Sequence, residues 1–354
     1  MAGETLRLLR RRARPMRIGL WAGLALALGM SLGMGMALGP VSIPLPELGR
    51  VLMARIRPGE GVDPTLMTIV WEVRIPRVLL MALAGAALAG AGAAYQGLFR
   101  NPLADPYLIG VAAGANLGAL IAVALNFPGV FAGLLGLPLA AFIGGILTVG
   151  LVYRLARVGK TLPLTTLLLS GVAVGAVLNA LSLGLLMLMV GRIAPYRAWI
   201  WMLGGYALGG WPALWGALPY VALGLGALVA LGYPLDVLQF GEEQALQLGL
   251  PVERVKRLAI AAATLATAGA VAFTGIIGFV GLIAPHLARL LIGPRYSRVI
   301  PASILLGATL LALADLLSRT LIPPQEIPLT LLTALLGGPF FLYLLSSTRR
   351  GAFF

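Results

Sequence analysis

Long runs of apolar residues, separated by short polar segments, repeat along the whole length of the chain. Apolar runs of about 18 residues or more are typical of transmembrane helices, whereas transmembrane β-strands alternate apolar and polar positions. The pattern therefore predicts an all-α, polytopic membrane protein, and it excludes a transmembrane β-barrel. We place ten spans at residues 18–38, 75–98, 107–126, 131–153, 162–190, 212–232, 258–277, 278–292, 299–322 and 327–346.

An even number of spans places both ends of the chain on the same side of the membrane. The basic residues indicate which side this is, because loops rich in Lys and Arg resist translocation. Residues 1–17 hold six arginines and one acid, and most other basic residues fall on the same side of the predicted spans. We therefore expect 1–17 to be a cytoplasmic tail, both termini to be cytoplasmic, and residues 1–354 to form a single domain in the cytoplasmic (inner) membrane.

The composition agrees with a membrane protein, since 60% of the residues are hydrophobic and only 11% are charged. A net charge of +14 would suggest nucleic-acid binding in a soluble protein. Here the basic residues lie in short loops, where they orient the chain in the membrane, so we expect no nucleic-acid partner. The first apolar run is too long for the roughly 7–15 apolar residues of a signal peptide, which predicts a retained first helix.

Two of the polar segments are long enough to have a structure of their own. Residues 40–74 contain several prolines and mixed charges, and we expect them to form a structured segment on the outer side. Residues 233–257 form the largest inner segment, with an amphipathic stretch at 242–250 between the turn formers Gly241 and Pro251. Its acidic residues disfavour an anionic lipid surface. We therefore expect this stretch to dock a cytoplasmic protein.

The chain offers little that could carry covalent chemistry. It has no cysteine and a single histidine, His286, so thiolate sites are excluded and a metal site is not expected. The tripeptide at 159–161, Gly-Lys-Thr, resembles the end of a phosphate-binding loop, but the required glycine five residues earlier is replaced by Arg154. We therefore expect no catalytic residue, no bound metal and no nucleotide site, so that any ATP chemistry belongs to a partner.

Charged residues near the predicted outer membrane surface need an explanation. Arg74 and Arg77 flank Pro76 at the outer start of the second span. A lipid phosphate and an acidic protein partner explain them equally well. Asp315 and Arg319 lie four residues apart on the ninth span, which is the spacing of a helical ion pair. Charges within a span often mark functional sites, so a local pair and an outer docking contact both stay open.

Several blocks of the sequence resemble the FecCD-type permeases of bacterial importers for ferric siderophores, haem and cobalamin. The combination of NPLADP with a downstream GFVGLIAPHLARLL is the most specific of them. The first 70 residues and the region 120–160 carry little of the signature. The blocks are RIPRVLLMALAGAALAGAGAAYQGLFRNPLADPYLIGVAAGANLGA (74–119), GEEQALQLGLP (241–251), GFVGLIAPHLARLL (278–291), LADLLSR (313–319) and EIPLTLLTALLGGPFFLYLL (326–345).

The resemblance implies the permease fold of a type II ABC importer, with ten spans in each subunit. Its expected partners are a second copy of the chain, two cytoplasmic ATPase subunits, an extracytoplasmic substrate-binding protein and membrane lipid. ATP and Mg would bind to the ATPase subunits, and this chain would hold no cofactor. The expected cargo is a ferric siderophore, haem or cobalamin, because the blocks do not distinguish between these substrates.

The resemblance also implies roles for particular residues. Three arginines, Arg74, Arg77 and Arg319, would receive acidic side chains of the binding protein. The inner segment would insert into the ATPase through Glu242, Glu243, Ala245, Leu248, Gly249, Leu250 and Pro251. The fifth span would line the translocation path through Ser170, Asn179, Leu186, Met187 and Met189.

Two other classes of membrane protein remain as alternatives. An ion-coupled secondary transporter needs titratable or ion-binding groups near the middle of the membrane, and Asp315 is almost the only candidate. An intramembrane enzyme needs a metal cluster, an activated nucleophile or a pair of acids, which this chain does not supply. The importer permease is therefore the favoured hypothesis.

Overall fold

The computed structural model describes residues 2–41, 43–55, 61, 63–125, 136–189, 199, 201–205 and 210–348. These residues are mostly helical and contain no β-strand, which confirms the predicted all-α class. The elements are α1 (Ala2–Ala37), α2 (Leu45–Ala54), α3 (Pro64–Thr68), the π-helix η1 (Ile69–Arg74), α4 (Ile75–Leu98), the 3₁₀ helix η2 (Pro106–Ile109), α5 (Val111–Ala124), α6 (Leu137–Ala156), α7 (Leu164–Leu188), α9 (Trp211–Ala230), α10 (Gly232–Leu238), α11 (Glu242–Gln247), α12 (Val252–Thr274), α13 (Val280–Ile292), α14 (Tyr296–Thr320) and α15 (Leu329–Thr348).

Each predicted span coincides with a helix where the structure describes it, and residues 126, 131–135 and 190 of these spans lie outside the described residues. The prediction of ten transmembrane helices needs correction in two ways. Seven helical segments of the described residues are long and apolar enough to cross a membrane, and the spans predicted at 107–126, 278–292 and 327–346 are shorter apolar helices. In addition, the short helices α2, α3, α10 and α11 raise the number of helices above ten. The span at 107–126 is shortened because Gly110 takes a left-handed conformation with φ +85°, so that α5 begins only at Val111.

Helix α4 lies at the centre of the bundle. Nearly all of its side chains are buried, and it packs against α9, α12, α13 and α14. Glycines make this packing possible, since a Cβ atom on Gly85 would lie 2.1 Å from the carbonyl oxygen of Gly307 in α14. A Cβ atom on Gly92 would lie equally close, at 2.1 Å, to the carbonyl oxygen of Gly281 in α13. Small residues let helix backbones approach closely in lipid, and here three helices meet backbone to backbone.

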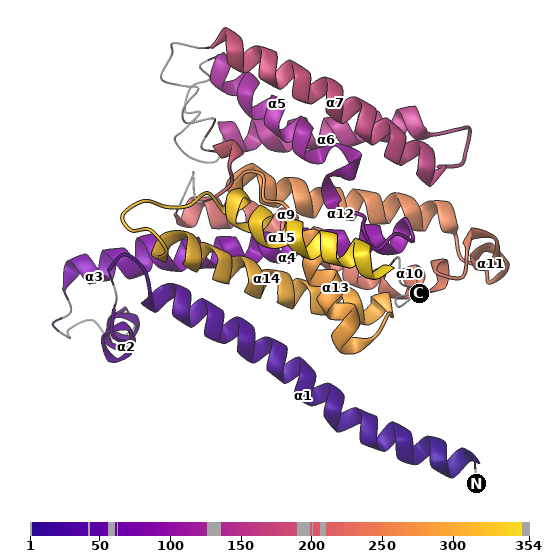
Figure 1. Cartoon of the computed structure of the whole chain (residues 1–354), viewed down its shortest axis with the longest axis horizontal. Coiled ribbons are helices and arrows are strands. Elements are labelled where there is room, and N and C mark those ends of the chain that lie inside the picture. Colours follow the sequence, from indigo (N-terminus) through magenta and orange to yellow (C-terminus); the bar gives the residue numbers. More distant parts are fainter. Residues whose placement is uncertain are drawn as a thin grey trace.

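Helices α5, α6 and α7 form a second group, which α12 joins to the helices around α4 (Figure 1). Helix α7 is the least covered of the long helices, since only 11% of its most apolar stretch is buried, against 89% for the segment that contains α4. Helix α1 is also largely uncovered, at 17%, and lies on the opposite side of the molecule (Figure 1). The bundle thus has a tightly packed centre and two exposed apolar flanks.

The two ends of the bundle differ in structure. One end carries α2 and α3 and is called the α2–α3 end below, whereas the other carries α11 and is called the α11 end (Figure 1). Helix α1 begins and α15 ends at the α11 end, which agrees with the even number of membrane crossings that the sequence predicts (Figure 1). The apolar bundle with short polar connections is that of a multi-pass membrane protein.

Candidate functional site

A cluster of ion pairs connects α4, α14 and the segment before α15 at the α2–α3 end. Asp315 is fully buried, and its Oδ1 accepts a hydrogen bond of 2.9 Å from Nε of Arg77. The Oδ2 atom of Asp315 lies 3.0 Å from Nε of Arg319, an ion pair by distance without hydrogen-bond geometry. The two terminal nitrogens of Arg77 donate to the two oxygens of Glu326, at 2.8 Å each. The charges of two arginines and two acids therefore compensate one another within the chain.

Glu326 lies in the connection between α14 and α15 and is the exposed member of this cluster, with a side chain 49% exposed. Burial by itself would raise the pKa of Glu326, but the hydrogen bonds and the charge of Arg77 outweigh burial and hold that pKa below its ordinary value. Glu326 is therefore ionised at neutral pH. Its paired contact with Arg77 is a charge-assisted, bidentate one, which restricts the guanidinium in orientation as well as in position.

The other guanidinium groups of this end bind the C-terminus of α1. Nη1 of Arg74 donates to the carbonyl oxygens of Met36 and Ala37, both at 2.9 Å. Nη2 of Arg319 donates to the carbonyl oxygen of Gly35 at 3.0 Å. The last four carbonyl groups of a helix lack partners within the helix and carry partial negative charge, so cations stabilise this end. The two arginines thus attach the exposed helix α1 to the bundle.

The three arginines predicted to dock a binding protein are therefore buried. Their exposed fractions are 4% for Arg74, 6% for Arg77 and 4% for Arg319, and each guanidinium has acceptors within the chain. The local pair expected between Asp315 and Arg319 is present. The role of Glu326 and the contact of Arg77 with Asp315 could not be predicted from the sequence, because residues 238 positions apart meet only through the fold. The docking role of the arginines stays a prediction.

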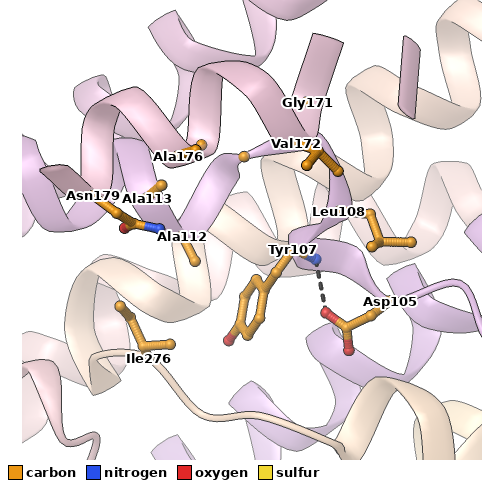
Figure 2. A pocket seen from close by; sticks show the side chains of 12 residues that line it. Asp105, Tyr107, Leu108, Ala112, Ala113, Gly171, Val172, Ala176, Asn179 and Ile276 are labelled. Atoms are coloured by element: carbon orange, nitrogen blue, oxygen red, sulfur yellow. Dashed lines mark hydrogen bonds between the residues drawn. The ribbon is translucent and has the colours of Figure 1, made fainter. Parts of the chain in front are cut away.

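A pocket of about 530 Å³ lies between η2, α5 and α7 (Figure 2). Two glycines of α7, Gly171 and Gly175, contribute to its lining. A Cβ atom on Gly175 would meet nothing within 4 Å, whereas one on Gly171 would lie 2.4 Å from the carbonyl oxygen of Leu108, so Gly171 lets α7 approach η2 closely. Its wall is mainly apolar, and three polar side chains contribute to it: Asp105, Tyr107 and Asn179. A mainly apolar wall with a few polar groups suits an organic molecule that carries some polar substituents.

Two of these polar side chains belong to the NPLADP block and its continuation. Oδ1 of Asp105 accepts a hydrogen bond of 2.9 Å from the backbone N–H of Tyr107 (Figure 2). The hydroxyl group of Tyr107 donates to the carbonyl oxygen of Ile277 at 2.9 Å and accepts from its N–H at 3.2 Å. Burial raises the pKa of Asp105 to about 6. The sequence showed this block as a signature, but not that it forms the wall of a pocket.

The residues predicted to line a path on α7 lie in different environments. Asn179 lines the pocket and is exposed to it. Met187 is 65% exposed, whereas Ser170 and Leu186 are partly buried. Met189 is only 3% exposed and packs in the core, so its position gives it no surface on a path. The pocket therefore supports Asn179 most directly among the five.

The amphipathic stretch predicted at the inner side forms α11 and the turn after it. Gly249 has φ +83°, a left-handed conformation that strains residues with a side chain. The N–H of Leu250 donates to the carbonyl oxygen of Ala245, and the N–H of Gly249 donates to that of Leu246, both at 2.9 Å. These two bonds define a Schellman motif, which ends α11 and turns the chain into α12.

The predicted coupling residues divide between a buried and an exposed face of this segment. Ala245 is fully buried in the core, and Glu242 and Leu250 are partly buried. The exposed members are Glu243, Leu248, Gly249 and Pro251. Leu248 is 70% exposed, so its apolar side chain is available for contact with another protein.

The described residues contain no group of three or more His, Cys, Asp or Glu side chains that could hold a metal ion. The ring of His286 lies edge-on to the ring of Phe340, with 5.4 Å between the ring centres. The single histidine is therefore part of an aromatic contact between α13 and α15.

Comparisons with known proteins agree over most of the chain. The model of the FecCD transport family matches residues 24–347. The chain is 44% identical over 285 residues to the cobalamin import system permease protein of Halobacterium salinarum, which covers 80% of this chain and 75% of that protein. It is 39% identical over 288 residues to the hemin transport system permease protein of Yersinia pestis, with coverage of 79% and 84%. A solved structure, an inward-facing conformation of a metal-chelate type ABC transporter, superposes with a TM-score of 0.82 at 31% identity, covering 93% of this chain and 99% of that one.

Proposed function

The chain belongs to the FecCD transport family, and on that premise we propose that it is the membrane-spanning permease subunit of an ATP-driven importer. Its cargo is an iron complex, such as a ferric siderophore or haem, or cobalamin, which an extracytoplasmic binding protein delivers. The observation that carries this proposal is the match of the family model across 24–347, together with relatives named for cobalamin and hemin transport.

Three features of the bundle support this function. The pocket beside α7 has a size and a mainly apolar wall that suit an organic chelate or macrocycle in passage. The α11 end presents a short helix followed by an exposed apolar side chain, Leu248, where a cytoplasmic ATPase would bind. The exposed flank of α7 would be covered by a second copy of the chain. ATP and Mg would then bind to the ATPase subunits, and this chain would supply no catalytic residue or cofactor site.

This function also assigns an orientation. The α11 end faces the cytoplasm together with both termini, because basic residues gather there, and the α2–α3 end faces the binding protein. Docking at that end is proposed to involve the cluster of Arg74, Arg77 and Arg319. Glu326 already accepts hydrogen bonds from both terminal nitrogens of Arg77. A carboxylate of the binding protein would therefore have to displace Glu326 or bind beside it at the edge of the cluster.

An ion-coupled secondary transporter is less well supported. Such a protein needs a titratable group that gains and loses an ion within the membrane. Asp315 was the main candidate, and it is fully buried between Arg77 and Arg319. A carboxylate enclosed by two guanidinium groups has little room for a coupling ion.

The function is tested with the chain purified together with its ATPase and reconstituted in liposomes with the binding protein. We expect uptake of one ligand among ferric siderophores, haem and cobalamin that requires ATP and all three proteins. Uptake by the chain alone, driven by a proton or sodium gradient, would contradict the proposal. A matched preparation with an ATPase unable to hydrolyse ATP serves as the control.

A further inference from the structure

Lys256 lies in the second turn of α12 with its side chain only 2% exposed. Its Nζ lies 2.6 Å from Oε1 of Glu253 and 3.0 Å from Oε2 of Glu242. The same Nζ donates to the carbonyl oxygen of Leu162 at 2.9 Å. The contacts with Glu242 and Leu162 are hydrogen bonds, and the contact with Glu253 is an ion pair by distance. We call Lys256 and these three partners the Lys256 link.

The three partners of Lys256 belong to three different parts of the fold. Glu242 is the first residue of α11, and Glu253 lies in the first turn of α12. Leu162 precedes the start of α7 by two residues. Oε2 of Glu253 also accepts the N–H of Leu162 at 3.1 Å, so both polar groups of the Leu162 backbone are held by side chains of α12. The link therefore joins the α11 surface to the beginning of the helix that lines the pocket.

The packing around α7 and α11 makes this link important for their positions. Helix α7 packs on α5, α6 and η2, and most of its surface is uncovered. Helix α11 has six residues, and Ala245 is the buried one. Weakly packed elements shift easily unless specific contacts hold them. A buried ammonium group bound to both elements is a contact of that kind.

We propose that Lys256 is a positioning residue that transmits displacement of α11 to α7 and so to the pocket. The proposal rests on the proposed function, since it takes α11 as the surface that the ATPase moves. When α11 is displaced, Glu242 moves with it. The ion pair between Glu242 and Lys256 then moves the ammonium group, which is bonded to the carbonyl oxygen of Leu162 just before α7. Leaving a buried charge without its partners is costly, so the three elements move together instead of separating. The residues of α7 on the pocket wall, including Gly171 and Asn179, then follow.

The test uses the full permease–ATPase complex in liposomes with the binding protein, and it measures ligand imported per ATP hydrolysed. In Lys256→Met we expect normal complex formation and ATP hydrolysis, with import per ATP reduced about fivefold or more, the lower range of couplings between distant sites. Lys160→Met is the matched control, because it makes the same chemical change at an exposed position of the turn that contains Leu162. We expect that control to import as the unmodified chain does.

A merely structural role for Lys256 predicts loss of folded protein or of the complex, with unchanged import per ATP in what remains. That result would overturn the inference. If Lys256→Met fails to fold, the variant Glu242→Gln tests the inference instead. The side chain of Glu242 is 39% exposed, and the loss of its charge weakens only the contact between Lys256 and α11. Unchanged import per ATP in Glu242→Gln would also overturn the inference. Absence of ATP-driven import in the unmodified chain would instead contradict the proposed function itself.

Discussion

At the scale of single residues, Asp315 is the centre of the charged cluster at the α2–α3 end. It is fully buried, and both neighbouring cations, Arg77 and Arg319, are almost completely buried as well. Removing one member of a buried ion pair is far more damaging than removing an exposed one, because the partner charge stays in a medium that cannot solvate it. The cluster also holds α1 through Arg319, so the effect reaches beyond the cluster.

The change Asp315→Asn is therefore expected to lower the free energy of unfolding by about 3–5 kcal/mol. Glu326→Gln is the matched control, since it removes a charge from the same cluster at a side chain 49% exposed. The control is expected to cost about 1 kcal/mol or less. Thermal unfolding of the detergent-solubilised variants measures both. An equal decrease in the free energy of unfolding for the two variants would contradict the assignment of Asp315 as the buried centre of the cluster.

At the scale of elements, contact between helix backbones holds the central helices together. The Gly85–Gly307 contact joins α4 to α14, and the Gly92–Gly281 contact joins α4 to α13. Glycine is needed at these positions for space, since a side chain would meet the carbonyl group of the neighbouring helix. Without such contacts the helices would have to lie further apart. The hydrophobic effect does not drive helices together within lipid, so their association depends on this close packing.

Gly85→Ala is expected to destabilise the fold by about 1–3 kcal/mol, because the added methyl group meets backbone that has no side-chain freedom to yield. Gly150→Ala in α6 is the matched control, since a Cβ atom there meets nothing within 4 Å. The control is expected to be neutral or slightly stabilising, because alanine favours helix more than glycine does. Thermal denaturation in detergent compares the two. A fall in melting temperature in the control as large as in Gly85→Ala would contradict the packing argument.

At the scale of the whole molecule, the two largely uncovered helices, α1 and α7, lie on opposite flanks (Figure 1). Lipid can cover either flank. The proposed function distinguishes them, because the pocket lies against α7 and would be completed by a second copy on that side. In a twofold dimer each surface patch near the axis meets the same patch of the other copy.

The absence of native cysteine allows a direct test of this arrangement. Single cysteines are introduced, one at a time, at the exposed α7 positions Leu169, Val177, Leu181 and Leu188. At least one of them is expected to form a disulfide-linked dimer in membranes. Leu26→Cys in α1, at a side chain 64% exposed, is the matched control and is expected to stay monomeric on a denaturing gel. Cross-linking through the α1 position but through none of the α7 positions would contradict a dimer interface formed by α7.

The sequence by itself determined the features that depend on local patterns. Apolar runs located the helices, since a segment in lipid must satisfy its own backbone hydrogen bonds whatever its neighbours are. The amphipathic stretch with its glycine located α11 and its turn, because the left-handed conformation at Gly249 is a local requirement. The motif blocks indicated the family, which the family model confirmed.

Only the tertiary structure decided which distant residues meet. Arg77 pairs with Asp315 and Glu326, and Lys256 holds Leu162, across separations of 94 to 249 residues. Likewise, it showed that Met189 lies in the core while Asn179 faces the pocket. The local sequence specifies that a segment is helical, but nearly uniform apolar faces do not specify its rotation or its neighbours. Those follow from backbone contacts at glycines and from the pairing of the few buried charges, and both depend on the whole chain.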